Sequence, residues 1–260
     1  METFVFKTKR QMGRAAAAAA AQEIKKAIAG KRRANIILAT GTSQFETLKS
    51  LTRCRTIDWS RVTVFHLDEY IGLDEDHPAS FRRYLKERFL EKVGTLKAVH
   101  FINADAADPL AECERLGKII AAHPIDAALV GIGENGHLAF NDPPADFQTQ
   151  KPFIIVQLDQ RCRRQQVTEG WFNKLEDVPK QAVSMSIRQL IKSACIIVSA
   201  PDQRKARAVR DALDAKVTNM CPASILQTHP DCKIFLDEAA ASLLSTGDRK
   251  KVDYEDTGTG

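Results

Sequence analysis

No stretch of the 260-residue sequence approaches the ~20 consecutive apolar residues of a membrane-spanning helix, so no membrane association is expected. The six cysteines contain no CxxC pair and no other metal-like spacing, and they predict reduced thiols in the cytoplasm. The chain also lacks internal repeats and linkers rich in proline or serine. Residues 1–248 are therefore expected to form one domain, and the polar residues 249–260 a disordered tail.

Charge is not concentrated in one region, although the formal net charge is +5. Basic residues form short clusters at 31–33, 161–164 and 249–251, which lie far apart and contain no interleaved aromatic residues. Such clusters are more typical of solvated surfaces than of nucleic-acid contacts, so no nucleic-acid partner is expected. The mild positive excess would instead attract a small anionic metabolite.

Residues 15–21 form a run of alanines near the N-terminus. Alanine is the strongest helix former but only weakly apolar, so the run favours a surface helix over a secretory signal peptide. The helical pattern continues to Gly30, and glycine is a typical helix C-cap. The sequence thus predicts a surface helix that ends at Gly30.

Short apolar runs alternate with helical patterns along the rest of the chain. This alternation predicts an α/β fold, a single domain with an open, mostly parallel sheet and helices on both faces. We expect strands at residues 35–40, 62–67, 125–132, 153–158, 195–199 and 233–236, and helices at residues 45–52, 79–93, 110–122, 202–215 and 222–227.

Polar clusters follow four of these predicted strands, at residues 40–43, 68–70, 133–137 and 201–205. In open parallel sheets, ligands bind beyond the carboxyl ends of the strands. The predicted architecture can therefore bring the four clusters together at one edge of the sheet.

Thr40, Gly41, Thr42 and Ser43 link a predicted strand to a predicted helix. Gly41 permits a tight turn, and the hydroxyl and free N–H groups at a helix start favour an anion such as phosphate. An ordinary Ser/Thr helix cap explains the segment equally well, and the segment is too short for a Walker loop. Lys205 starts a later helix, where a bound phosphate would fit it and a solvated lysine is the equal alternative.

Asp68 and Glu69 directly follow an apolar strand. A carboxylate at this position can act as a general base, bind a metal or cap a turn, and capping is the simplest interpretation of the pair alone. No nearby set of histidine and acidic residues repeats a ligand spacing, so metal binding is a less attractive interpretation of the pair.

Residues 131–143 form the most informative stretch, with three glycines within six residues after a buried strand. His137 lies in this turn, and an imidazole exchanges protons near neutral pH. Asn135 and Asp142 could fix its tautomer by hydrogen bonding. A histidine that only caps a loop is the alternative interpretation.

These clusters, in this order and spacing, resemble the glucosamine-6-phosphate deaminase family, which is related to 6-phosphogluconolactonase. The resemblance runs from about residue 4 to residue 244 and rests mainly on residues 39–43, 68–70 and 131–143. It implies a Rossmann-like domain and a deaminating isomerase that converts glucosamine 6-phosphate to fructose 6-phosphate and ammonia. It implies no metal or organic cofactor, and it is compatible with a homo-oligomer.

The resemblance also implies roles for individual residues. His137, with Asn135 and Asp142 around it, would assist opening of the pyranose ring. Asp68 would take the proton from C2 and deliver it to C1. The substrate would contact Thr40, Gly41, Thr42, Ser43, Glu69, Gly136 and Lys205.

Three positions depart from the family pattern. Asn135 stands where many members have an aspartate, and Asp142 where a glutamate is frequent. Gln166 replaces a phosphate-binding arginine, for which one of the arginines at residues 161–164 could substitute.

Two other functions compete with the deaminase hypothesis. A lactonase of the same fold could use His137 as its base, but lactone hydrolysis needs no C2 base and leaves Asp68 unexplained. A non-catalytic sugar-phosphate sensor would carry an extra DNA-binding segment, and none is recognisable before Thr40.

Overall fold

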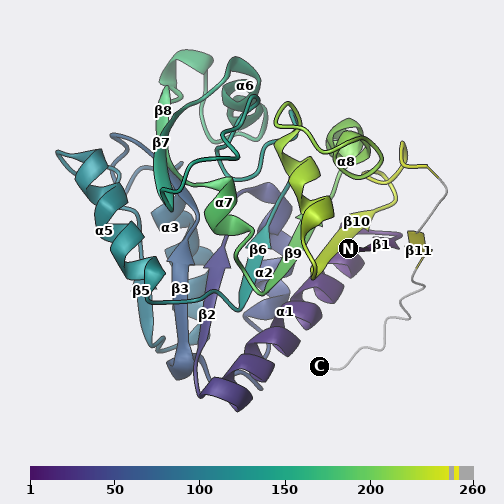
Figure 1. Cartoon of the computed structure of the whole chain (residues 1–260), viewed down its shortest axis with the longest axis horizontal. Helices are drawn as coiled ribbons and strands as arrows, with labels where there is room; N and C mark the ends of the chain where they lie inside the picture. Colours follow the sequence, from purple (N-terminus) through teal and green to yellow (C-terminus); the bar gives the residue numbers. More distant parts are fainter. Residues whose placement is uncertain (246–248, 252–260) are drawn as a thin grey trace.

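The computed structural model describes residues 1–245 and 249–251. Its main sheet contains eight parallel strands in the order β11-β1-β10-β9-β6-β2-β3-β5 (Figure 1). This arrangement confirms the predicted open parallel sheet. The strands are β1 (Glu2–Phe6), β2 (Ala34–Leu38), β3 (Val62–His66), β5 (Ala98–His100), β6 (Ala127–Val130), β9 (Cys195–Ala200), β10 (Cys232–Asp237) and β11 (Arg249–Lys251).

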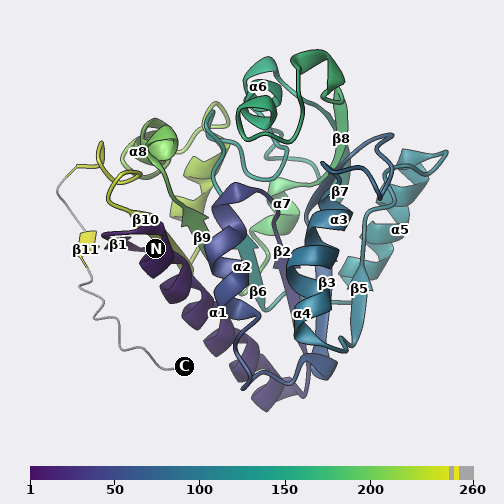
Figure 2. The ribbon, with the colours of Figure 1, turned by 180° about the vertical axis from the view of Figure 1, so that it is seen from behind.

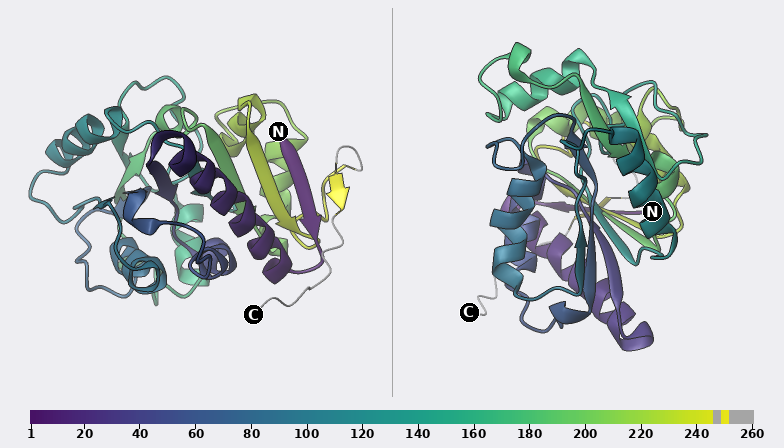
Figure 3. Two further views of the ribbon diagram at one scale, coloured as in Figure 1. Left: turned by 90° about the horizontal axis from the view of Figure 1, so that it is seen from below. Right: turned by 90° about the vertical axis from the view of Figure 1, so that its left-hand side faces the viewer.

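Helices cover both faces of this sheet (Figures 2 and 3). Successive residues of a strand point to opposite faces of the sheet: Ile36 and Leu38 pack against one layer of helices, and Ile37 against the other. The first layer holds α1 (Lys9–Lys31), α2 (Phe45–Leu51), α3 (Phe81–Leu85), a π-helix (Lys86–Leu90) and α4 (Glu91–Val93). The second holds α5 (Pro109–Ala121), α7 (Ile187–Leu190), α8 (Ala206–Leu213) and the 3₁₀ helix Pro222–Thr228.

The alanine-rich helix α1 ends one residue later than predicted. It continues through Gly30 to Lys31, and the C-cap Arg32 takes the left-handed conformation with φ 59° and donates its N–H to the Ile28 carbonyl oxygen. One face is buried against the sheet and the other is exposed, as in a surface helix. Small residues allow close packing: a Cβ on Gly13 would lie 2.4 Å from that of Glu46 in α2.

A second, smaller sheet was not predicted. It contains β4 (Asp68–Tyr70), β8 (Gln181–Met185) and β7 (Phe153–Gln157), and all of its pairs are antiparallel. The segment 153–158 was expected in the main sheet. It lies at the edge of the small sheet instead, and its partly exposed residues fit that half-covered position.

Several other strands also differ from the prediction. Strands β1, β5 and β8 had no predicted counterpart; β1 and β5 are only partly buried, whereas β8 is buried at four of its five residues. Residues 249–251, expected in a disordered tail, pair with β1 as strand β11. The rest of that predicted tail, residues 252–260, lies outside the described residues, as do 246–248. Within the described ranges, no helix has the length and apolar character required to cross a membrane.

Candidate active site

A cavity lies beyond the carboxyl ends of β2, β3 and β6, where the sequence predicted the site. Polar residues from segments far apart in the chain line it together. Of the predicted site residues, the lining contains Thr40, Gly41, Thr42, Ser43, Asp68, His137 and Lys205.

The turn after β2 forms the end of the cavity that was predicted to bind phosphate. Gly41 has φ 97°, a conformation that glycine adopts without strain, and the Tyr84 hydroxyl donates to its carbonyl oxygen at 2.9 Å. The chain then enters the 3₁₀ helix Thr42–Gln44. Space is tight across the cavity, because a Cβ on Gly131 would lie 2.8 Å from the Ser43 hydroxyl. Backbone and hydroxyl donors therefore converge on one small volume.

Lys205 brings a positive charge to the same cavity. Its side chain is buried at the end of a 3₁₀ turn before α8. Burial lowers the pKa of Lys205, and the nearby carboxylates of Glu169 and Glu134 partly oppose this effect. An ammonium held away from water gains most from an anionic ligand, so this position favours a phosphate.

Asp68 begins β4, two residues after the main-sheet strand β3 ends at His66. Only 6% of the residue is exposed, and it borders the cavity. Burial, together with the adjacent charge of Glu69, raises the pKa of Asp68 well above its usual range. A buried carboxyl group with a raised pKa is suited to accepting and returning a proton.

Glu69 does not lie in the cavity lining, although it was predicted to contact substrate. Its side chain points the other way, as residues in a strand alternate, and is completely buried. The carboxylate accepts hydrogen bonds from the N–H groups of Tyr70, Phe81 and Arg82 and from the Ser80 hydroxyl, at 2.9–3.2 Å. The structure thus places Glu69 at the N-terminus of α3, where it anchors that helix to β4.

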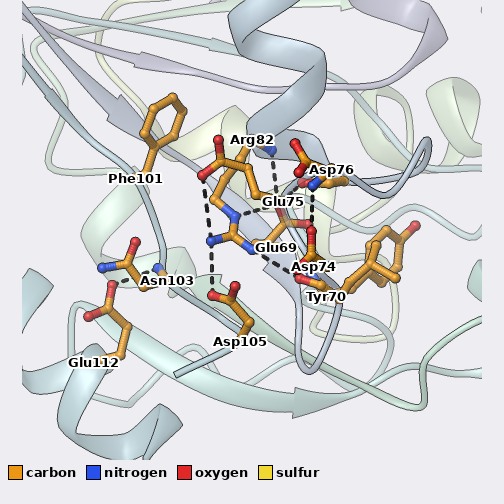
Figure 4. A network of polar contacts seen from close by, with 12 residues as sticks. Glu69, Tyr70, Asp74, Glu75, Asp76, Arg82, Phe101, Asn103, Asp105 and Glu112 are labelled. Carbon is orange, nitrogen blue, oxygen red and sulfur yellow. Dashed lines mark hydrogen bonds and ion pairs between the residues drawn. The ribbon is translucent and has the colours of Figure 1, made fainter. Parts of the chain in front are cut away.

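A buried arginine completes this anchor (Figure 4). Arg82 lies with its Nε 3.7 Å from the Glu69 carboxylate, and donates to Asp105 and to the Leu73 carbonyl oxygen, both at 2.9 Å. These bonds connect β4, the loop after it, and the segment after β5. Because β4 carries Asp68, the network also fixes the position of the proposed base.

His137 lies opposite, in the glycine-rich turn after β6. Its Nδ1 is 3.1 Å from Oδ1 of Asp142, and its backbone N–H donates to Oδ1 of Asn135 at 3.2 Å. Burial alone would raise the pKa of Asp142, but the hydrogen bonds from His137 and Asn135 lower it. The two residues predicted to orient the imidazole therefore both contact His137.

Asn135 is explained by a neighbour that the sequence analysis did not identify. Its amide Nδ2 donates to Asp142 at 2.9 Å and to Asp159 at 3.0 Å. An aspartate at position 135 would place a third carboxylate against these two, whereas the amide donates to both. The departure from the family pattern is thus matched by Asp159, which no local motif marks.

Two glycines in this turn fit its close contacts. A Cβ on Gly133 would lie 2.2 Å from Nε2 of His137, so only glycine leaves room for the imidazole. Gly136 has φ 84° and would bring a Cβ within 2.9 Å of the Cys221 sulfur. Gly136 shapes the turn and is not part of the cavity lining, unlike its predicted role as a substrate contact.

The segment predicted to cover the site forms α6 (Gln160–Thr168), which lies above the carboxyl edge of the sheet (Figure 1). Gln166 is buried and lines the cavity, together with Gln165 and Glu169, two residues that the sequence analysis missed. The arginines at 161, 163 and 164 do not line it, and Arg163 instead donates to the carbonyl oxygens of residues 175 and 178. None of them replaces the phosphate-binding arginine in this structure.

Comparison with known proteins agrees with the geometry. The family described as glucosamine-6-phosphate isomerases/6-phosphogluconolactonase matches residues 7–234. The chain is 38% identical over 208 residues to a glucosamine-6-phosphate deaminase of Exiguobacterium sibiricum, covering 80% of each chain. It is 39% identical over 208 residues to one of Streptococcus pneumoniae, covering 80% of this chain and 86% of that protein.

Two solved structures are similar to this chain over most of its length. A monomeric glucosamine-6-phosphate deaminase superimposes with a TM-score of 0.85 at 31% identity, covering 94% of this chain and 100% of that one. A 6-phosphogluconolactonase from Trypanosoma brucei superimposes with a TM-score of 0.77 at 18% identity, covering 94% and 99%. At the lower identity, the likeness shows a shared fold.

Proposed function

Since the chain belongs to the glucosamine-6-phosphate isomerase/6-phosphogluconolactonase family, we propose that it is a deaminase that converts glucosamine 6-phosphate and water to fructose 6-phosphate and ammonia. The observation that carries this proposal is the buried carboxylate of Asp68 at the cavity, opposite a histidine and near a buried lysine.

Substrate binding uses the phosphate end of the cavity. The phosphate lies against the turn formed by Gly41, Thr42 and Ser43 and forms an ion pair with Lys205. Both partners are shielded from water, which strengthens their attraction. The sugar then extends towards Asp68 and His137.

Ring opening is the first chemical step. His137 moves the proton between the C1 hydroxyl and the ring oxygen, which yields the open-chain aldehyde. Asp142 holds Nδ1 of the imidazole, so the other ring nitrogen is free for the sugar.

Asp68 then performs the isomerisation. The carboxylate takes the proton from C2, next to the aldehyde, and returns it to C1, so that the C2–N bond becomes an imine. Water adds to this imine and ammonia leaves, giving the ketose phosphate. The raised pKa of Asp68 lowers the cost of holding the proton between the two transfers.

A lactonase of the same fold is the second candidate, and Asp68 decides between them. Hydrolysis of a lactone uses a base to activate water but involves no proton on carbon, so Asp68 would have no task in it. The relatives at 38–39% identity are deaminases, whereas the Trypanosoma brucei lactonase shares only the fold.

A coupled assay for ammonia release, run with the 6-phosphates of glucosamine, galactosamine and mannosamine, tests the proposal. We expect release from glucosamine 6-phosphate, and a parallel assay with 6-phosphogluconolactone should give no hydrolysis above background. Lactone hydrolysis without ammonia release from any amino sugar would make the lactonase the correct function.

We also propose a cytoplasmic location, supported by six cysteines that are all free thiols in the structure. A homo-oligomer is compatible with the family resemblance, whereas one deaminase of known structure is described as monomeric. Light scattering on the purified chain distinguishes the two.

A further inference from the structure

Three potential metal ligands lie together beside the cavity. His137, Asp142 and Cys162 each offer one ligand atom, and these atoms all lie within 4.8 Å of one another. The residues come from the glycine-rich turn and from the first turn of α6, so no local spacing in the sequence reveals the cluster. In a tetrahedral zinc site, with metal–ligand distances of about 2.0–2.3 Å, ligand atoms lie about 3.3–3.8 Å apart. The cluster therefore needs only small side-chain movements to close around an ion.

The charge around the cluster also favours a cation. Cys162 is 1% exposed, and the negative charges of Asp142, Asp159 and Asp68 surround its sulfur. Burial and these carboxylates raise the pKa of the thiol well above its usual range. A divalent cation would reverse this balance, because the same carboxylates that oppose a thiolate attract the metal.

Two of the three residues border hollows of the surface. His137 borders the active-site cavity, and Asp142 borders a separate groove between α5 and β7. Cys162 lines neither hollow, so a cation would enter past His137 or Asp142. The fourth position of a tetrahedral ion remains open for water.

We propose that Nδ1 of His137, a carboxylate oxygen of Asp142 and the Cys162 sulfur bind Zn²⁺ or a similar soft divalent cation, and that this binding inhibits the enzyme. The thiol proton passes to solvent, and the imidazole proton moves from Nδ1, where it faces Asp142, to Nε2. The metal then replaces the hydrogen bond between Asp142 and His137 and holds the imidazole in its own coordination geometry. The inhibition, unlike the metal binding, rests on the proposed ring-opening role of His137.

A second cluster serves as an internal control. Glu23, Cys195 and Asp231 also have ligand atoms within 4.8 Å of one another. However, the Lys233 ammonium already lies 2.9 Å from Glu23, 3.4 Å from Asp231 and 3.7 Å from the Cys195 sulfur. This lysine neutralises the cluster and repels a cation, so the first cluster is the better site.

Cobalt(II) titration of the purified full-length chain, in the absence of chelators, tests the binding. A thiolate bound to Co²⁺ gives a charge-transfer absorption band, and added Zn²⁺ removes it. We expect the band in the wild type and in Cys195→Ser, and its loss in Cys162→Ser. The apparent affinity for Zn²⁺ should fall at least about tenfold in Cys162→Ser. Circular dichroism confirms that each variant is folded.

An alkylation experiment on the wild type avoids any dependence on a variant. Zn²⁺ should slow alkylation of Cys162, followed by mass spectrometry of its peptide, more than alkylation of Cys195. A band that persists in Cys162→Ser, a band lost only in Cys195→Ser, or no band and no protection in the wild type would overturn the proposal.

The activity measurement is separate. Zn²⁺ should suppress ammonia release by the wild type, and a chelator should restore it. If cobalt binds at Cys162 but no ammonia is released even without metal, the metal site stands and the proposed deaminase function fails. Undiminished ammonia release with Zn²⁺ bound would refute the inhibition.

Discussion

Replacing Asp68 by asparagine should make the protein more stable and nearly inactive at the same time. The two side chains have almost the same shape, but an amide cannot accept the C2 proton. A positioned general base contributes about 10²–10⁴-fold to a rate, so kcat should fall by that factor, or about 2.7–5.4 kcal/mol of activation free energy. The proposed phosphate contact with Lys205 does not involve Asp68, so KM should change much less.

The gain in stability follows from the burial of the Asp68 carboxylate. Its pKa is raised in the folded state, so the folded protein holds this proton more tightly than the unfolded chain does. Ionisation of Asp68 therefore costs stability as the pH rises above the unfolded carboxyl pKa, and the cost is fully present above the folded pKa. Removing a buried charge of this kind typically stabilises by about 1–2 kcal/mol.

Urea unfolding at two pH values measures this effect. At pH 7.5, the free energy of unfolding of Asp68→Asn should exceed that of the wild type by about 1–2 kcal/mol, and the melting temperature should rise by about 2–8 °C. Below the unfolded carboxyl pKa the difference should vanish, because Asp68 is then protonated in both states. The control Asp177→Asn removes a half-exposed carboxylate beside Lys174 and should change stability by less than about 0.5 kcal/mol. An Asp68→Asn variant that is less stable than the wild type at pH 7.5, or that retains full kcat, would refute the reasoning.

Three further substitutions test other parts of the structure. Glu69→Ala leaves three buried N–H groups and the charge of Arg82 without their partner, and should lower the free energy of unfolding in urea by about 3–5 kcal/mol. A large fall in kcat/KM without this loss of stability would instead support a contact between Glu69 and the substrate. Gly133→Ala forces a Cβ against the imidazole of His137, and should reduce kcat/KM at least about tenfold and the free energy of unfolding by about 1–3 kcal/mol. Kinetics equal to those of the wild type would contradict so close an approach of the ring to the backbone. Lys205→Met should raise KM for the sugar phosphate about 10–100-fold with kcat less affected, whereas an unchanged KM and unchanged inhibition by inorganic phosphate would place the phosphate elsewhere.

Much of the fold could be predicted because parallel strands are buried on both faces. Residues 195–199 and 233–236 were predicted from continuous apolar runs, and strands β9 and β10 differ from these ranges by only one residue at an end. The rule that ligands bind beyond the carboxyl ends of strands then brought Asp68, His137 and the turn at Gly41 together. These positions follow from local pattern and topology alone.

The remaining contacts depend on side chains that meet only in the folded chain. The family resemblance implied a substrate contact for Glu69, yet the alternation of a short strand turns its side chain towards α3. Asp159 and Glu169 lie in a polar helical segment whose pattern resembles any solvated helix. Their contacts with Asn135 and Arg204 arise from packing of α6 over the sheet, which composition does not encode.

Asp68 begins the small antiparallel sheet, whereas the phosphate turn, His137 and Lys205 all follow strands of the main sheet. In the proposed mechanism, residues after the main-sheet strands bind the phosphate and open the ring, and the three-stranded sheet supplies the base. Exchanging β4 and its partners between relatives would transfer the carbon-acid chemistry as a unit. Exchanging the turn at Gly41 should instead change only which anionic group is bound. The small sheet and the turn at Gly41 can therefore be exchanged separately, although both border the same cavity.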